Sequence, residues 1–243
     1  MASYGRGEDG VYRDPIPLGV KIRMALIALL FIGAIVFLSV RGCSAGETVA
    51  PVHGPLRISC VGDSITYGYG LRDPDTECWV SLLRDELPEG SSVANFGVSG
   101  SCMLVNSSYP WASTAAARAF WEAEEDVVII MLGTNDVCDW MWDAAVFEHD
   151  YQAFVEEVQA KPGNPRIVLM TPPTLYINPE LDARLSDEAI PAINRIAERT
   201  GASVIDLHTF TAGHPEWFDD GVHPNARGNE EIFAYVAESL NAL

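Results

Sequence analysis

An unbroken apolar run, Asp126–Leu132 (DVVIIML), constrains the fold of this chain more than any other stretch. Its β-branched residues favour a strand, and the absence of polar alternation is typical of a strand buried on both faces. Such strands belong to parallel sheets that carry helices on both sides. The sequence therefore predicts an α/β fold.

The rest of the chain from residue 56 fits this fold, because short apolar runs alternate with helical patterns. The predicted strands are Leu56–Val61, Ser92–Phe96, Asp126–Leu132, Pro165–Met170 and Ser203–Leu207. The predicted helices are Glu77–Leu87, Ala115–Ala123, Tyr151–Gln159, Glu188–Thr200 and Asn229–Leu240. In such sheets, chemistry lies beyond the carboxyl ends of the strands.

A second apolar run, Met24–Val40, lies near the N-terminus and has no polar face. Its length of ~25 Å is marginal for a bilayer core of ~30 Å unless flanking cations reach the interface. We predict a cytoplasmic disordered tail over 1–20, a transmembrane signal-anchor over 21–42 and a linker over 43–55. The excess of Lys and Arg before the span predicts a single-pass cell-membrane location with an extracytoplasmic domain.

Two alternatives for this segment stay open. Small residues around Ala45 allow cleavage of a signal peptide and secretion of the domain. Cys43 also allows a lipoprotein, although Arg41 does not suit the small-residue context of such sites.

Charge and cysteine content exclude other classes. The formal net charge of −19 argues against nucleic-acid binding, which requires a basic face. No C-x-x-C pair occurs, and no histidines have ligand spacing, so we predict no metal and no cofactor. Cys60, inside the first predicted strand, is expected to be a buried thiol. The sequence does not indicate an oligomeric state.

Four polar motifs follow the predicted strands and should meet at one sheet edge. They are Gly62-Asp63-Ser64-Ile65-Thr66, Asn95-Phe96-Gly97-Val98-Ser99-Gly100, Gly133-Thr134-Asn135-Asp136 and Asp219-Asp220-Gly221-Val222-His223-Pro224-Asn225. Together they contain a hydroxyl, glycine amides, a carboxamide, carboxylates and an imidazole, which are the groups that acyl transfer needs.

These motifs, in this order over residues 56–240, make the chain similar to the SGNH hydrolases, the GDSL-type esterases and lipases. The resemblance implies an SGNH domain over 56–243, with a three-layer α/β/α sandwich and a five-stranded flavodoxin-like sheet. It implies a carboxylic ester hydrolase with Ser64 as nucleophile and His223 as general base. It assigns the oxyanion hole to the Ser64 amide, the Gly97 amide and the Asn135 side chain.

The chemistry of these groups suits the roles. A serine hydroxyl needs a base to take its proton, and His serves near neutral pH. His223 needs a carboxylate to fix its tautomer, and Asp220 can reach it from the same loop, with Asp219 as competitor. Ser99 does not complete a G-x-S-x-G elbow and is expected to be structural.

The aromatic residues on the loops after the second and third strands are candidate substrate contacts: Tyr109, Trp111, Trp140 and Trp142. The motifs look most like those of the carbohydrate-esterase and sialate-acetylesterase-like branch. That resemblance implies removal of a short acyl group, acetyl above all, from a sugar. An O-acyltransferase using the same serine and a non-catalytic carbohydrate-binding module are the alternatives. A disulfide between Cys102 and Cys138, with Cys78 as a rival partner, is compatible with an outward-facing domain.

Overall fold

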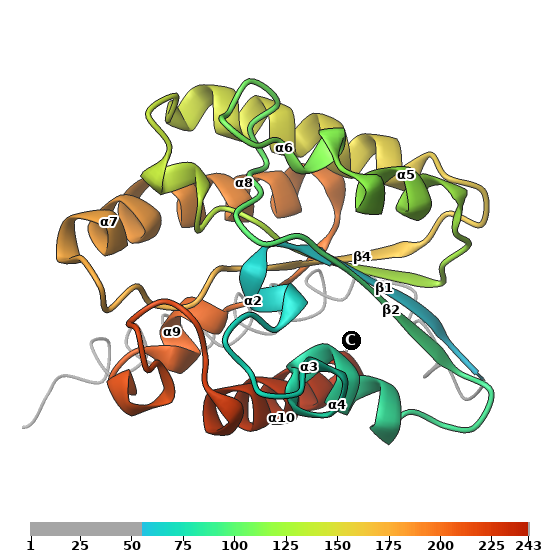
Figure 1. The fold of residues 1–243 in the computed structure, drawn as a ribbon. Helices are drawn as coiled ribbons and strands as arrows, with labels where there is room; N and C mark the ends of the chain where they lie inside the picture. The colour runs from blue at the N-terminus through green and yellow to red at the C-terminus, as the bar shows by residue number, and fades with distance from the viewer. Residues whose placement is uncertain (1–54, 243) are drawn as a thin grey trace, which may run out of the picture. The chain divides into compact units, whose positions relative to one another are not determined.

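The computed structural model of this chain describes residues 55–242. In this part, a five-stranded sheet has the order β2-β1-β3-β4-β5, and all its neighbouring strands are parallel (Figure 1). This is the flavodoxin-like order of doubly wound folds, so the predicted α/β fold and its parallel sheet are confirmed. The strands are β1 (Arg57–Gly62), β2 (Ser92–Gly97), β3 (Val127–Met131), β4 (Arg166–Met170) and β5 (Ser203–Ile205).

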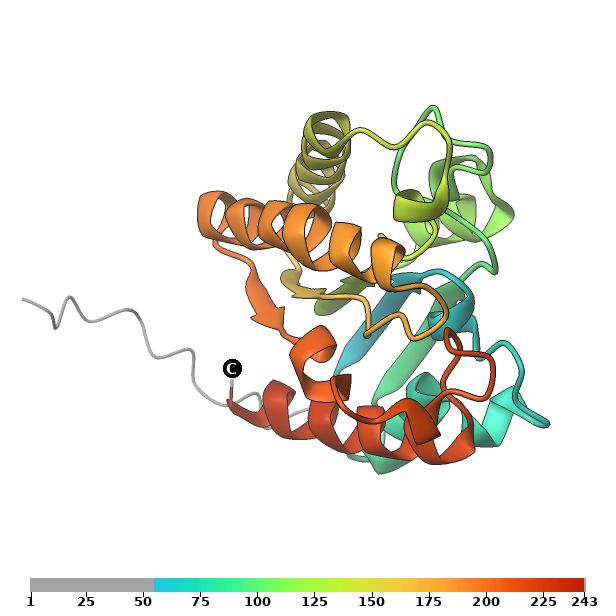
Figure 2. The same cartoon turned by 90° about the vertical axis from the view of Figure 1, so that its left-hand side faces the viewer.

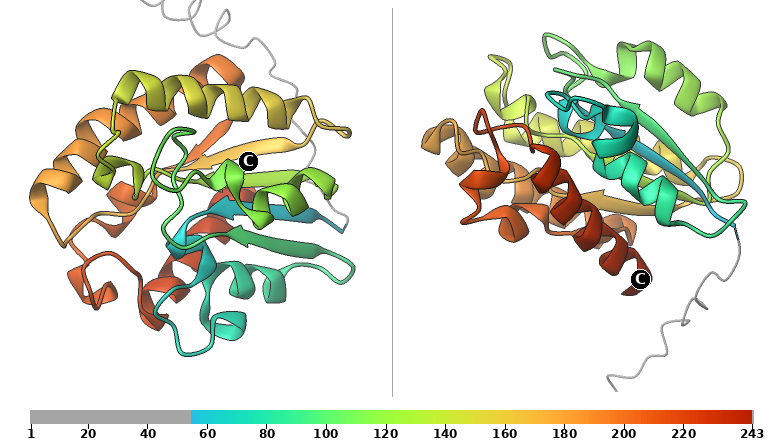
Figure 3. Two further views of the ribbon diagram at one scale, coloured as in Figure 1. Left: turned by 45° about the horizontal axis from the view of Figure 1, so that its top comes forward. Right: turned by 60° about the horizontal axis from the view of Figure 1, so that its bottom comes forward.

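Helices cover both faces of the sheet, as Figure 1 and the two views of Figure 3 show. One face carries α5 (Ala115–Glu122), α6 (Ala144–Gln159), α7 (Pro179–Arg184), a π-helical turn η3 (Leu185–Ala189) and α8 (Ile190–Thr200). The other face carries α4 (Trp79–Glu86), α9 (Leu207–Thr211) and α10 (Ala226–Ala242). The short helices are α2 (Ser64–Tyr67), α3 (Pro74–Glu77), η1 (Trp111–Ser113), η2 (Asp136–Cys138) and η4 (Pro215–Trp217).

The central strand β3 explains why this arrangement is stable. All of its residues are buried, and they alternate between two separate apolar clusters, with Val128 and Ile130 on one face and Ile129 and Met131 on the other. Gly62, at the end of β1, is in register with Gly97 of β2 and Met131 of β3. The carboxyl ends of three adjacent strands therefore lie side by side, as the sequence predicts.

Several predicted helices have different bounds in the structure, and for two of them the local cause is plain. The predicted helix Glu77–Leu87 is two helices, because Cys78 has extended backbone angles (φ −72°, ψ 142°) and separates α3 from α4. Helix α6 begins at Ala144 rather than at Tyr151, because the Asp143 side chain accepts hydrogen bonds from the amides of Ala145 and Val146. Such a cap satisfies amides that a helix start leaves free.

The helical stretch around Pro191 is longer than the sequence predicts. The sequence places it in the first turn of a helix that starts at Glu188, and Pro191 does lie in the first turn of α8. However, η3 and α7 precede that turn, so helical backbone continues from Pro179. A π-helical turn widens the helix where a proline removes one backbone donor, which is why Pro191 does not end it.

The membrane location needs correction. No helix in residues 55–242 is long and apolar enough to cross a bilayer. A span requires about 20 consecutive apolar residues, whereas α6 has 16 residues, α10 has 17, and both carry charged side chains. This finding contradicts the predicted single-pass location in the cell membrane. The predicted tail, anchor and linker (1–20, 21–42 and 43–55) lie outside the described residues, as does Met24–Val40.

Candidate active site

Ser64 lies at the start of α2, directly after β1. The side chain of Asp63 caps this short helix by accepting a hydrogen bond from the Ile65 amide at 2.9 Å. Ser64 is 5% exposed. Its own amide is at the free N-terminal end of α2 and has no acceptor among the described residues. The turn thus fixes both the hydroxyl and the amide of Ser64 at the sheet edge.

His223 and Asp220 form a hydrogen-bonded chain with Ser64. His223 Nε2 lies 2.9 Å from Ser64 Oγ, and Nδ1 lies 2.7 Å from Asp220 Oδ2. An ionised carboxylate can only accept, so Nδ1 carries the proton and Nε2 is the acceptor for the serine hydroxyl. This is the tautomer that a general base needs.

Asp220, not Asp219, is the carboxylate partner of the histidine. Its Oδ1 accepts hydrogen bonds from the amides of Val222 and His223 at 2.9 and 2.8 Å. Burial alone would raise the pKa of Asp220, but the hydrogen bonds from His223 and Val222 lower it below its ordinary value. Asp219 instead accepts a hydrogen bond from Asn225 Nδ2 at 2.9 Å.

The structure does not offer Gly97 as an oxyanion donor. The amide of Gly97 already donates to Asn95 Oδ1 at 2.9 Å. A glycine is needed here because a Cβ at this position would lie 2.4 Å from the backbone nitrogen of Tyr67. The hydrogen bond from Gly97 to Asn95 is an Asx turn, in which an Asn side chain accepts from the amide two residues later. The spacing of Asn95 and Gly97 in the sequence is a signal for such a turn.

Gly100, in the same motif, has an amide without an acceptor among the described residues. The side chain of Asn135 contacts the residue after Gly100, because Asn135 Nδ2 donates to the carbonyl of Ser101 at 3.0 Å. This bond uses one of the two amide protons of Asn135 and leaves the second for a ligand. Gly100 and Asn135 thus each have a donor free for a ligand within the described residues.

Two buried carboxylates, Asp63 and Asp136, contact the loops that carry the site. Asp136 accepts hydrogen bonds from the amides of Met103 and Leu104 at 3.0 and 2.8 Å, which ties the loop after β2 to the loop after β3. Burial raises the pKa of Asp136 to about 7 and that of Asp63 to about 6. Asp136 is not among the site residues predicted from the sequence, although it stands directly after Asn135.

The four aromatic candidates do not form one group. Trp111 is buried in the core and donates to the Phe96 carbonyl, so it cannot contact a substrate at the surface. Trp142 packs on Phe147 and donates to Glu188 at 2.9 Å. Only Tyr109 and Trp140 are exposed, by 45% and 83%.

Tyr69, which is not among the residues predicted from the sequence, packs on the His223 ring with 4.6 Å between the ring centroids. Its position between two glycines directly after the Ser64 motif was the available signal.

The cysteines of the described part are all free. Cys60 is a buried thiol, as predicted. Cys78 and Cys102 are buried, Cys138 is exposed, and no disulfide joins them. Within residues 55–242, no cluster of three or more His, Cys, Asp or Glu could hold a metal ion.

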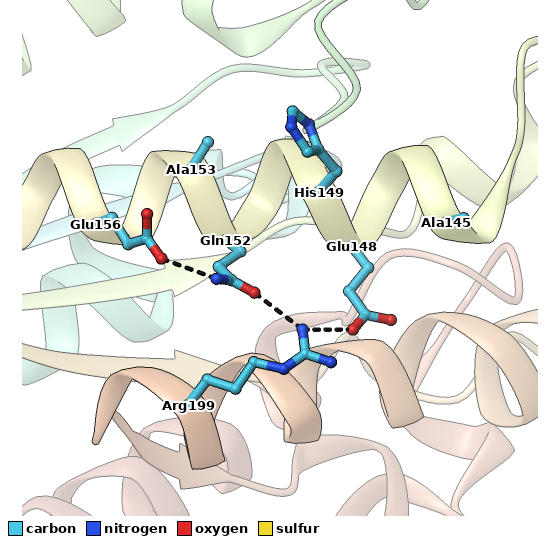
Figure 4. A pocket seen from close by; sticks show the side chains of 7 residues that line it. All are labelled: Ala145, Glu148, His149, Gln152, Ala153, Glu156 and Arg199. Atoms are coloured by element: carbon cyan, nitrogen blue, oxygen red, sulfur yellow. Dashed lines mark hydrogen bonds and ion pairs between the residues drawn. The ribbon is translucent and has the colours of Figure 1, made fainter.

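A separate groove lies along α6, and Figure 4 shows the side chains that line it. Its volume is about 540 Å³. Arg199 of α8 crosses to the α6 side chains, with ion-pair and hydrogen-bond distances of 2.7 Å to Glu148 and 2.9 Å to Gln152. None of its lining residues comes from the motifs at the strand ends, so the groove is not part of the candidate site.

Comparison with known proteins places the chain in a family. Residues 60–231 match the GDSL-like lipase/acylhydrolase family. An acetylxylan esterase of Xylanibacter ruminicola is 30% identical over 215 residues, which cover 79% of this chain but only 44% of that protein. Thioesterase 1/protease 1/lysophospholipase L1 of Escherichia coli is 25% identical over 186 residues, covering 75% of this chain and 82% of that protein.

Solved structures share the fold. An acetylxylan esterase from Geobacillus stearothermophilus has a TM-score of 0.59 at 23% identity, covering 78% of this chain and 96% of that one. An aryl esterase of M. smegmatis has a TM-score of 0.63 at 22% identity, covering 77% and 99%. The family match spans most of the described residues and includes Ser64, Asn135, Asp220 and His223. The predicted family and enzyme class are thereby confirmed: the chain belongs to the GDSL-like lipase/acylhydrolase family of ester hydrolases.

Proposed function

We propose that this chain is a serine esterase that removes acetyl groups from carbohydrate esters through an acyl-enzyme. The observation that carries the proposal is the hydrogen-bonded chain from Ser64 Oγ through His223 to Asp220. Similarity to acetylxylan esterases in sequence and fold supports the acetyl group and the carbohydrate.

In the acylation step, Ser64 Oγ attacks the ester carbonyl while His223 Nε2 takes the hydroxyl proton. The imidazolium is stabilised by Asp220, whose lowered pKa keeps it ionised near neutral pH. Collapse of the tetrahedral intermediate breaks the bond to the alcohol, and His223 returns the proton to the departing oxygen. Water then attacks the acetyl-enzyme by the same base catalysis and releases acetate.

The negative oxygen of the intermediate needs donors that are in place beforehand. We assign these to the Ser64 amide, the Asn135 side chain and the Gly100 amide. Gly100 replaces Gly97 in this assignment, because the amide of Gly97 is engaged by Asn95. No metal or cofactor takes part in the proposed steps.

The two exposed candidates among the aromatics, Tyr109 and Trp140, are the proposed platform for a sugar ring beyond the reacting ester. Aromatic faces of this kind pack against apolar surfaces of a ligand. Trp111 and Trp142 are left out, because one is buried and the other is held by Phe147 and Glu188.

The test compares acetate release from acetylated xylan and from p-nitrophenyl acetate by the wild type and by Ser64→Ala. We expect loss of nearly all hydrolysis in the variant, and equal rates would refute the proposal. Free sugar added to the wild-type reaction separates hydrolysis from acyl transfer. Acetyl transfer to the sugar that outpaces acetate release would favour the acyltransferase alternative. A non-catalytic binding module would bind acetylated xylan without releasing acetate.

A further inference from the structure

Tyr69 covers the imidazole of the proposed general base. The ring centroids of Tyr69 and His223 are 4.6 Å apart and the ring planes are tilted by 48°. The Tyr69 amide donates to the Ser64 carbonyl at 2.9 Å, which fixes where this residue leaves the short helix α2. Tyr69 nevertheless remains 52% exposed. Half of its surface is therefore available beside the histidine.

Ile177 contacts the same catalytic loop from a different segment. The amides of Tyr176 and Ile177 donate to the Gly221 carbonyl at 2.8 and 3.1 Å. Gly221 has a φ of +80°, and a Cβ there would lie 2.8 Å from the Ile177 nitrogen, so a side chain would push the two segments apart. Ile177 is 60% exposed. The loop with Asp220 and His223 thus lies against the segments after α2 and after β4 (Figure 2).

These two side chains belong to a wider pattern in the described residues. Of the large hydrophobic residues that are exposed there, only Trp121 and Val146 lie away from the segments that follow the strands' carboxyl ends. The others stand on the segments after β1, β2, β3 and β4. Tyr67 lines a separate groove beside α4 and β2, and the remaining five are Tyr69, Val105, Tyr109, Trp140 and Ile177. Apolar side chains that gather at one place on a surface mark a binding region.

The chemistry of the histidine decides which part of an ester these residues meet. His223 Nε2 must return its proton to the departing alcohol oxygen, so the alcohol lies next to the imidazole during acylation. In the proposed oxyanion hole, the carbonyl oxygen points toward Asn135 and Gly100. A side chain that packs on the imidazole is therefore placed to contact the departing alcohol.

We propose that Tyr69 and Ile177 form the alcohol subsite and set the selectivity for the leaving group. Their exposed apolar surfaces suit the carbon face of a pyranose ring, which stacks on aromatic and aliphatic side chains. This inference rests on the proposed esterase function and adds to it the residues that recognise the sugar. Tyr69 acts by contact with the alcohol, and the acetyl-enzyme no longer contains that group.

The test measures kcat/KM for two pairs of substrates. One pair shares the acetyl group and differs in the alcohol: acetylated xylobiose and ethyl acetate. The other pair shares the alcohol and differs in the acyl group: p-nitrophenyl acetate and p-nitrophenyl butyrate. We expect Tyr69→Ala to lower the preference for acetylated xylobiose over ethyl acetate by about two- to tenfold, the range of one aromatic contact. The acetate-to-butyrate ratio should not change.

Matched controls separate this role from a structural one. Tyr67→Ala removes a tyrosine of almost equal exposure, 51%, that lines a different groove beside α4 and β2, and it should leave the alcohol preference as in the wild type. Tyr69→Phe should keep most of the preference, because the ring face provides the contact. Ile177→Ala should lower the preference in the same direction, and Val146→Ala on α6 should not.

The outcomes distinguish this subsite from the function on which it rests. If wild-type hydrolysis does not depend on Ser64, both the function and the subsite are overturned. If it does, and Tyr69→Ala slows every ester by the same factor, the subsite alone is overturned and Tyr69 only supports the histidine. A changed acetate-to-butyrate ratio with an unchanged alcohol preference would also overturn it, because the residue would then face the acyl group.

Discussion

Asn95 shows how one side chain changes the role of its neighbour. Two glycines stand in the motif after β2, and the resemblance to the family assigned the oxyanion donor to Gly97. The Asn95 carboxamide occupies the amide of Gly97 and also donates to the Thr66 carbonyl at 2.7 Å. The motif can thus be recognised in the sequence. Which of its two glycines has an amide free to bind an oxyanion depends on the contact between Asn95 and Gly97.

Asp220 should be the carboxylate on which turnover depends. Replacing it in Asp220→Asn leaves an amide that can also donate, so the His223 tautomer with a free Nε2 acceptor is no longer fixed. We expect kcat to fall by roughly 10³- to 10⁴-fold. Asp219→Asn is the control, because Asp219 contacts Asn225 and not the imidazole. Steady-state kinetics on p-nitrophenyl acetate measures both, and equal losses in the two variants would contradict the assignment.

Asn135 should act mainly in the transition state. Loss of its free amide proton in Asn135→Ala removes a donor to the oxyanion, and we expect kcat to fall by about 10²- to 10³-fold with little change in KM. Asn194→Ala, an exposed asparagine on α8, controls for the substitution itself. A variant with raised KM and normal kcat would mean that Asn135 binds substrate without stabilising the intermediate.

At the level of elements, Asn229 joins two helices that are far apart in the sequence. The helix predicted from the sequence begins at this residue, over Asn229–Leu240. In the structure α10 begins at Ala226, and the side chain of Asn229 is buried within its first turns. Its Oδ1 accepts from the Trp79 amide at 3.0 Å, and its Nδ2 donates to the Pro224 carbonyl at 2.8 Å. Asn229 thus caps the first amide of α4, although it lies far from α4 in the sequence.

We predict that Asn229→Ala lowers the free energy of unfolding by about 1–3 kcal/mol, because the buried Trp79 amide loses its acceptor. Denaturant unfolding measures this change. The neighbouring surface variant Glu230→Ala should stay within about 0.5 kcal/mol of the wild type. If Asn229→Ala were equally stable, the contact between α4 and α10 would not depend on this hydrogen bond.

The sequence predicted best those strands and helices that have a local sequence pattern. Most of the strands contain apolar runs, and all five were placed within two residues at each end. Helix α6 was shortened because Asp143 was not recognised as its cap, although an Asp before Ala144 is a typical helix start. The long helical stretch before Pro191 could not be predicted in this way, because a π-helical turn has no simple sequence pattern.

For the whole molecule, the sheet edge was predictable and the contacts across it were not. A parallel sheet brings the segments after its strands to one side, so the polar motifs could be expected to meet there. Asp220 and His223 share one loop, so their pairing could be proposed from the spacing. That Trp111 turns into the core while Tyr69 covers the imidazole depends on side-chain packing between segments. In residues 55–242 no helix could span a bilayer, which contradicts the predicted single-pass location.

The buried carboxylates under the site should make the stability of the whole molecule depend on pH. Burial raises the pKa of Asp136 to about 7, whereas an unfolded aspartate titrates near 3.9. Between about pH 4 and pH 7 the folded state therefore binds more protons than the unfolded state, and this group's contribution to stability falls as pH rises. Above about pH 7 the contribution is constant. Asp63, with a pKa of about 6, acts in the same direction.

The variant Asp136→Asn isolates this effect, because its side chain has nearly the same shape and does not titrate. Carboxylates with lowered pKa values, such as Asp126 and Glu148, have the opposite pH dependence but are present in both proteins and cancel in the difference. We expect the stability of the variant relative to the wild type to increase from pH 4 to pH 7 and then to level off, as measured by denaturant unfolding at each pH. The opposite slope would mean that the amides of Met103 and Leu104 stabilise the charged carboxylate more than burial destabilises it. Asp136 would then be a permanently ionised brace between the two loops.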